Sequence, residues 1–133
     1  NALISKGHPA LLNSLPRLLN QVGGAKWEDR QPMIDHLADY HLVALDDLGT
    51  ERQSEYVIEQ MTAILDTLYR AGTPLIITTN QDPTQLSRAS SIAIQRIWDR
   101  ILERCHLIPV IGESRRRGKG QATYHDTKDI LGL

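Results

Sequence analysis

Compact apolar runs alternate along the chain with longer segments in which apolar residues recur every three or four positions. The compact runs predict buried strands at residues 41–45, 74–79 and 107–111, and a further short apolar run occupies residues 9–12. The three-to-four spacing predicts helices at residues 16–22, 31–39, 54–71 and 92–105. Apolar runs separated by helices are typical of an α/β domain whose mostly parallel sheet is covered by helices on both faces.

Glycine and proline mark several ends of these predicted helices. Gly7, the pair Gly23-Gly24 and Gly72 follow helical segments and are expected to end them, while Pro32 is suited to a first turn. The side chains expected to face the core are Leu15, Leu18, Leu19, Val22, Met33, Ile34, Leu37, Val57, Met61, Ile64, Leu65, Leu68, Ile97, Trp98, Ile101 and Leu102. Residues 1–112 form the predicted core, and residues 113–133 form a basic tail that we expect to be poorly ordered.

Two adjacent acids, Asp46 and Asp47, follow the strand predicted at residues 41–45. In parallel α/β sheets the chemistry lies beyond the carboxyl ends of the strands, so these carboxylates are candidate functional groups. The pattern is that of a Walker B element, in which the first acid holds Mg²⁺ through its water shell and the second polarises an attacking water. The alternative is a pair of solvated acids that open a loop.

The next predicted strand ends in Thr78-Thr79-Asn80. An amide at a strand end beside a carboxylate pair has the chemistry of a sensor of the terminal phosphate, because it can hydrogen-bond both phosphate and water without adding charge. The alternative is that Asn80 only begins the turn that leads to Pro83, a common role for asparagine. The two strand ends together are a more specific pattern than either alone.

The segment HLVALDDLGTE, the helix QSEYVIEQMTAILDTLYRAG and the strand TPLIITTN together resemble the DnaC/IstB-like branch of the AAA+ ATPases. The likeness continues through IQRIWDRILERC and GESRRR and spans about residues 1–117. Proteins of this branch load the replicative helicase or assist some transposases, using ATP and Mg²⁺. The resemblance implies that Asp46 is the Mg²⁺-associated acid, that Asp47 occupies the catalytic acid position and that Asn80 is sensor 1.

Arginines form a second group of candidates. Arg96, Arg100 and Arg104 recur every fourth residue and so lie on one face of their predicted helix, from which one could reach a neighbouring subunit's terminal phosphate. The resemblance favours Arg100 for this arginine finger, with Arg96 second, and we interpret Arg104 as part of a solvated face. Arg116, in a basic run with Lys119, is a candidate nucleotide sensor or DNA-phosphate contact, or part of a soluble tail.

The phosphate-binding loop of this family, G-x-x-x-x-G-K-[ST], has no counterpart in the sequence. Residues 23–26 lack its spacing and its hydroxyl, and residues 118–120 lie in the tail. Because residues 1–7 resemble the end of the helix that follows this loop, we expect the loop and its strand to precede residue 1. We therefore expect weak or no ATP binding by these residues alone, no hydrolysis, and a domain-swapped or rearranged sheet where that strand would lie.

Charge and composition add to this picture. Residues 1–66 carry five Lys/Arg against ten Asp/Glu, and residues 67–133 carry ten against six. An acidic half suits a metal and a basic half suits phosphates, so we expect single-stranded DNA to contact the C-terminal half, although uneven scatter is the simpler alternative. The single cysteine cannot form an internal disulfide, which predicts the reducing cytoplasm. No stretch approaches the ~20 apolar residues of a membrane span, so no membrane partner is expected.

The sequence therefore predicts part of an oligomeric, ATP-driven accessory protein of DNA replication whose partner is a replicative helicase. One alternative is a transposition helper ATPase whose partner is a transposase. Another is an interaction module that binds either partner without hydrolysing ATP. A phosphoacceptor receiver-like domain is a fourth class, but it needs an aspartate at the strand end where this chain has Thr78-Thr79-Asn80.

Overall fold

The computed structural model describes residues 2–49, 54–82 and 91–112. Three parallel strands form one sheet in the order β1-β2-β3, namely β1 (Ala10–Ser14), β2 (Leu42–Asp46) and β3 (Leu75–Ile77). β2 is central, and its Ala44 is paired with Leu12 on one side and Ile76 on the other. The predicted α/β fold with a parallel sheet is confirmed, and the apolar run at residues 9–12 lies largely within a strand.

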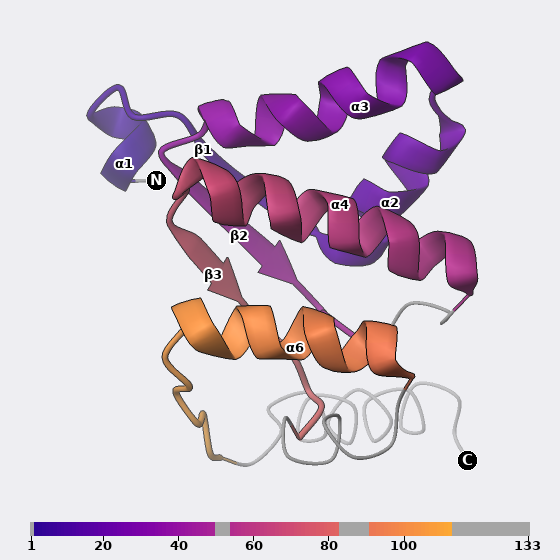
Figure 1. Cartoon of the computed structure of the whole chain (residues 1–133). Coiled ribbons are helices and arrows are strands. Elements are labelled where there is room, and N and C mark those ends of the chain that lie inside the picture. Colours follow the sequence, from indigo (N-terminus) through magenta and orange to yellow (C-terminus); the bar gives the residue numbers. More distant parts are fainter. Residues whose placement is uncertain (1, 50–53, 83–90, 113–133) are drawn as a thin grey trace, which may run out of the picture.

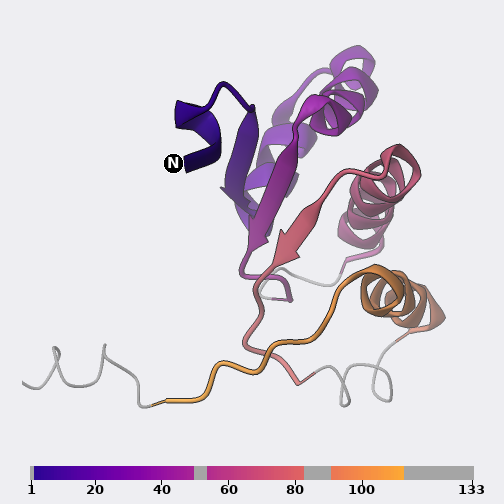
Figure 2. The same ribbon diagram turned by 90° about the vertical axis from the view of Figure 1, so that its left-hand side faces the viewer.

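The helices of the described residues lie mainly over one face of this sheet. They are α1 (Ala2–Ser5), α2 (Leu15–Gly24), α3 (Trp27–His36), the 3-10 helix η1 (Leu37–Asp39), α4 (Glu55–Ala71) and α6 (Ile92–Arg104). Figure 1 shows α3, α4 and α6 stacked beside one another, and Figure 2 shows α2, α3, α4 and α6 on the same side of the strands. On the opposite face, Leu12 and Ile76 remain 77% and 52% exposed.

A single apolar core lies between the sheet and this helical layer. Leu15, Val43 and Ile64 are completely buried, and Leu45 and Leu68 are at most 1% exposed. Burying a side chain of this size contributes about 1.5–3 kcal/mol to folding, so these contacts from β2, α2 and α4 hold the layers together. Trp98 on α6 belongs to the same core, as its helical position predicts.

Local sequence signals fix the ends of two helices. The Ser54 hydroxyl accepts a hydrogen bond from the Val57 N–H at 3.3 Å and so caps the start of α4. Gly72 follows the helix with a φ of 69°, in the left-handed region where a side chain is unfavourable. The prediction for this helix is confirmed at both ends, and the helix predicted at residues 92–105 is confirmed as α6.

The prediction for residues 31–39 was wrong in its start and in the helix type of its last three residues. α3 begins at Trp27, four residues before the predicted start, and Pro32 lies inside the helix rather than in its first turn. The helical pattern there is interrupted by η1, because the last turn tightens into a 3-10 helix. Two predicted core residues are also exposed, Met33 at 37% and Leu102 at 38%, since each lies just outside the apolar stripe of its helix.

The strand predicted at residues 107–111 is absent. The structure assigns no strand there, and Leu107, Ile108, Val110 and Ile111 are 62–94% exposed. A strand needs a neighbour that completes its hydrogen bonds, and within the described ranges no strand pairs with this segment. Pro109 also removes one donor, which disfavours pairing further. Apolar composition alone therefore gave the wrong prediction.

One prediction concerns a part of the chain beyond this description. The basic tail at residues 113–133, with Arg116, lies outside the described residues. Within the described residues, no helix is both long and apolar enough to cross a membrane.

Candidate nucleotide-hydrolysis site

Three of the predicted functional residues lie at or just after the carboxyl ends of β2 and β3. Asp46 is the last residue of β2 and Asp47 follows it, while Asn80 follows β3 by three residues. Because β2 and β3 are parallel neighbours, their carboxyl ends lie at the same edge of the sheet. The side chains of all three residues are exposed and thus accessible to a ligand.

Thr78 connects the two acids. Its hydroxyl donates a hydrogen bond to the Asp46 carboxylate and accepts one from the Asp47 N–H at 3.2 Å. A hydroxyl can donate only one hydrogen, so this arrangement orients it uniquely toward Asp46. The bond occupies Oδ1 of Asp46 and fixes the rotation of the carboxylate, with Oδ2 on the other side of the group.

The backbone turns sharply after these acids. Asp47 has a φ of 62°, in the left-handed region that costs a non-glycine residue about 1–3 kcal/mol. The next residue anchors the turn, because Leu48 is 1% exposed and its N–H donates to the Thr78 carbonyl at 2.9 Å. The strained conformation at Asp47 is therefore held by the burial of Leu48 and by hydrogen bonds from β3 and the residues that follow it.

Two further residues after β3 clasp the same loop. The Thr79 hydroxyl donates to the Leu48 carbonyl at 2.7 Å, and the Gln81 amide donates to the Gly49 carbonyl. Gly49 has a φ of 92°, and a Cβ placed on it would lie 2.7 Å from Cδ of Gln81. Glycine is thus favoured at position 49 by its backbone conformation, and a side chain there would displace the Gln81 amide.

The sequence predicted the acids and the amide, but it missed the three residues that position the loop. Thr78, Thr79 and Gln81 each form a hydrogen bond to residues 46–49. A usable signal was available, since two hydroxyl side chains directly precede a candidate sensor at a strand end. Their partners become evident only when β3 is aligned beside β2.

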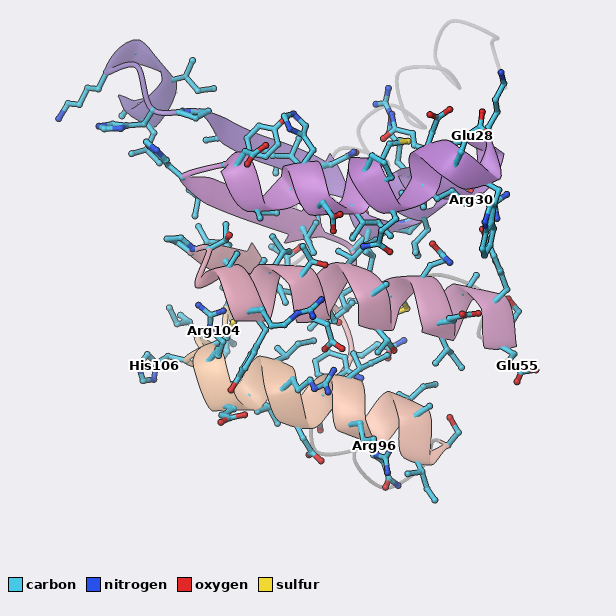
Figure 3. All side chains as sticks on the ribbon, turned by 45° about the horizontal axis from the view of Figure 1, so that its top comes forward. Glu28, Arg30, Glu55, Arg96, Arg104 and His106 are labelled. Carbon is cyan, nitrogen blue, oxygen red and sulfur yellow. The ribbon has the colours of Figure 1, made fainter. Side chains whose placement is uncertain are left out.

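The arginines of α6 differ in their surroundings. Arg100 forms an ion pair with Asp66 of α4, and Arg104 donates to the carbonyls of Leu68 and Tyr69 near the end of α4. Arg96 is exposed on the second turn of α6 and is labelled in Figure 3. Arg104 thus binds backbone groups of α4 instead of forming only a solvated face. Arg100 would have to leave Asp66 to reach a neighbouring subunit.

One cysteine lies beside this contact between α4 and α6. Burial raises the pKa of the Cys105 thiol, and the charge of Arg104 lowers it to a smaller extent. The net direction disfavours the thiolate, which is the nucleophilic form. Cys105 is therefore suited to packing against the core rather than to catalysis.

The donor set at the strand ends fits a magnesium-bound nucleotide better than it fits a metal held by protein alone. Within residues 2–49, 54–82 and 91–112, no group of three or more His, Cys, Asp or Glu side chains could enclose a metal ion. Mg²⁺ commonly keeps several waters and binds one or two carboxylates together with substrate phosphates. Asp46 and Asp47 are carboxylates of this kind, and Asn80 follows the neighbouring strand.

Comparison with known proteins adds two solved structures with the same fold. No protein-family model matches the chain, and no curated protein matches its sequence. The structure of AMPPCP-bound DnaA from Aquifex aeolicus has a TM-score of 0.58 and 18% identity, over 72% of this chain and 31% of that one. A DNA replication initiation factor has a TM-score of 0.67 and 18% identity, over 100% of this chain and 39% of that one.

These similarities concern the fold, since the identity is low and the chain spans well under half of either structure. The described part of the chain therefore shares its α/β fold with parts of these two structures.

Proposed function

We propose that this chain is the Walker B and sensor portion of an ATP-driven accessory protein of DNA replication, of the kind that loads a replicative helicase. The observation that carries the proposal is the hydroxyl of Thr78, which joins the Asp46 carboxylate to the Asp47 backbone at the carboxyl end of the sheet. A solvated acid pair would need no such connection. The likeness of fold to a DnaA bound to AMPPCP, an ATP analogue, supports the same class of ligand.

In this proposal each residue has a distinct part. Asp46, oriented by Thr78, would hold Mg²⁺ through the waters of its hydration shell. Asp47 accepts a hydrogen bond from the attacking water, which makes that water a better nucleophile. Asn80 donates to the terminal phosphate and orients the same water. ATP would supply the phosphoryl group that reacts, and Mg²⁺ would neutralise the negative charge of its phosphates.

The proposed partners follow from the same assignment. Arg100 or Arg96 would complete the site of a neighbouring copy, so the active form is an oligomer. Arg116 and the basic C-terminal half would contact nucleotide or single-stranded DNA. The two structures with the same fold are both named as replication proteins, which favours a replicative helicase over a transposase as the protein partner.

The first test is Mg-ATP binding, measured by calorimetry on these 133 residues and on the longest protein that the gene encodes. We expect the longer protein to bind and hydrolyse ATP, and Asp46→Asn or Asn80→Ala to abolish hydrolysis. Asp39→Asn is the matched control, because Asp39 is an exposed acid that pairs with His36 instead of bordering the strand ends. Failure of the longer protein to bind ATP, or equal loss in the control, would contradict the proposal.

A second test separates the possible partners. Immobilised full-length protein loaded with ATP is offered a replicative helicase and a transposase from the same source. We expect ATP-dependent retention of the helicase that Asp46→Asn weakens. Retention of the transposase alone would support a transposition helper, and retention that ignores both ATP and Asp46 would support a non-hydrolysing interaction module.

A further inference from the structure

Two histidines lie side by side at the amino ends of β1 and β2, at the opposite end of these strands from Asp46. His8 precedes β1 by two residues, and His41 directly precedes β2. Because the two strands are parallel neighbours, their amino ends lie at the same edge of the sheet. Figures 1 and 2 show α1 beside the amino end of β1. Both histidine side chains are exposed, so an ion from solvent can reach them.

The backbone at both histidines is fixed by hydrogen bonds. The His8 N–H donates to the Leu3 carbonyl at 3.0 Å, which ties it to α1. The His41 N–H donates to the Pro9 carbonyl at 2.8 Å, which extends the pairing of β1 and β2 by one residue. Gly7 has a φ of 78°, the left-handed conformation that commonly ends a helix. The fold therefore sets the Cβ positions of the two histidines and leaves their side-chain torsions to adjust.

The two imidazole rings approach each other through the same nitrogen. Nδ1 of His8 lies 3.0 Å from Nδ1 of His41, and the ring centres are 5.1 Å apart with the planes inclined at 46°. A neutral imidazole has one N–H and one bare nitrogen, so one ring donates to the other and the pair shares a single hydrogen at this contact. A metal ion in place of that hydrogen would receive a lone pair from each ring.

The separation of the two nitrogens fits two ligands of one metal ion. With metal–nitrogen distances of ~2.0–2.1 Å, a separation of 3.0 Å corresponds to an angle of about 90–97° at the ion. A tetrahedral ion such as Zn²⁺ would need the nitrogens about 3.3–3.4 Å apart. Square-planar or tetragonal coordination by nitrogen is typical of Cu²⁺ and Ni²⁺. The distance therefore favours these two ions over zinc.

Two imidazoles supply only part of a coordination sphere. Across the described ranges, no group of three or more His, Cys, Asp or Glu side chains could hold a metal ion. Water would fill the remaining positions, so the site would be open to solvent. Mg²⁺ prefers oxygen ligands, and a pair of imidazoles discriminates against it. Selection for a transition metal thus separates this edge of the sheet from the strand ends at Asp46.

We propose that His8 and His41 together bind one Cu²⁺ or Ni²⁺ ion through their Nδ1 atoms. The ion joins the amino ends of β1 and β2 and, through the His8 backbone, holds the end of α1 to the sheet. An ion that binds only the folded state stabilises it against unfolding. The inference goes beyond the proposed function and is independent of ATP, since neither histidine belongs to the strand-end site.

The first experiment locates the ion on the full-length protein. Copper(II) chloride is titrated while backbone amide signals are followed, because paramagnetic Cu²⁺ broadens the signals of residues close to it. We expect saturable broadening that begins around residues 7–10 and 40–43, and no response there to magnesium chloride. Calorimetry should give a higher affinity for Cu²⁺ than for Ni²⁺, following the general order for nitrogen ligands. Absence of saturable broadening around these residues overturns the proposal.

His8→Gln and His41→Gln are the matched variants, because each removes one imidazole and keeps a side chain that can hydrogen-bond. Either change leaves a single ligand, so we expect the affinity for Cu²⁺ at this edge to fall by about tenfold or more. His106→Gln is the control, since His106 is an exposed histidine that follows α6. Equal affinity of His8→Gln and His106→Gln overturns the proposal.

Thermal unfolding followed by circular dichroism provides a second readout and shows whether each variant is folded. We expect nickel(II) chloride to raise the Tm of the unaltered protein and of His106→Gln, and to raise that of His41→Gln less. An equal rise in all three proteins overturns the proposal. Zinc chloride is titrated in parallel, and tighter binding of Zn²⁺ than of Ni²⁺ at residues 7–10 and 40–43 would overturn the choice of ion.

Discussion

The loop after β2 and the groove between α2 and α4, which Leu19, Gly24 and Tyr56 help to line, are formed in different ways. The loop is held by side chains, because Thr78, Thr79 and Gln81 each bond to residues 46–49. The groove is left open by Gly23 and Gly24, which contribute no side chains. Glycine therefore has a different structural role in each region. At Gly49 it permits a close contact with Gln81, and at Gly24 it leaves open space.

The largest expected effect comes from Gly49→Ala. Alanine at this position would have an unfavourable positive φ. Its Cβ would lie 2.7 Å from Cδ of Gln81, so the Gln81 side chain must move away from the Gly49 carbonyl. We expect a loss of about 2 kcal/mol or more in the free energy of unfolding, measured by urea denaturation. A loss below about 0.5 kcal/mol would mean that Gln81 moves away freely and that the loop is not clasped.

Thr78→Val tests the connection between the acids without changing the shape of the side chain. It removes the donor to Asp46 and the acceptor for the Asp47 N–H, so we expect a loss of about 1 kcal/mol in stability. In the full-length protein we expect the ATP hydrolysis rate to fall by about tenfold or more, since Asp46 loses its orientation. Thr78→Ser is the control and should retain most of both, because it keeps the hydroxyl. Equal hydrolysis by the valine and serine variants would argue against a positioning role.

The same substitution in the open groove should have the opposite sign. Gly24→Ala meets no atom within 4 Å and replaces a helical glycine, so we expect an increase of about 0.5–1 kcal/mol in stability. Thermal unfolding in parallel with Gly49→Ala provides the direct contrast. Destabilisation by Gly24→Ala would show that the end of α2 needs glycine for its conformation and would weaken the explanation of the groove by space.

Two arginines of α6 allow a similar comparison with smaller expected effects, because Arg100 is ion-paired and Arg96 is exposed. Arg100→Ala breaks the partly exposed pair with Asp66 and should cost about 0–1 kcal/mol, whereas Arg96→Ala should leave stability unchanged. Hydrolysis by the full-length protein then identifies the finger. Loss of hydrolysis on replacing Arg96 alone would assign the role to Arg96 and leave Arg100 as a structural contact.

Periodicity predicted the helices better than the strands. α4 and α6 were found with nearly correct ends, because an apolar stripe, the Ser54 cap and the Gly72 stop are all local features. Residues 41–45 and 107–111 look alike as apolar runs, yet only the first corresponds to a strand. The difference is the neighbour, since β2 is paired with β1 and β3 on its two sides.

The candidate site divides in a similar way. Asp46, Asp47 and Asn80 were predicted because an acid pair after one apolar run and an amide after the next form a combination that is visible in the sequence. The contacts of Thr78 and Gln81 could not be predicted, because they join residues more than 30 positions apart. Such contacts depend on the register between β2 and β3, which the sequence pattern leaves open.

The sequence by itself determined the elements whose causes are local: the apolar stripes of α4 and α6, their ends, and the acids and amide that follow β2 and β3. The tertiary structure decided which apolar run became a strand, which hydroxyl orients Asp46 and where two helical glycines leave a groove. Each of these depends on which segments lie side by side, since a hydrogen bond or a cavity requires two surfaces at a fixed distance. Capping and helical periodicity need only neighbours in the chain, and for that reason they can be read from it.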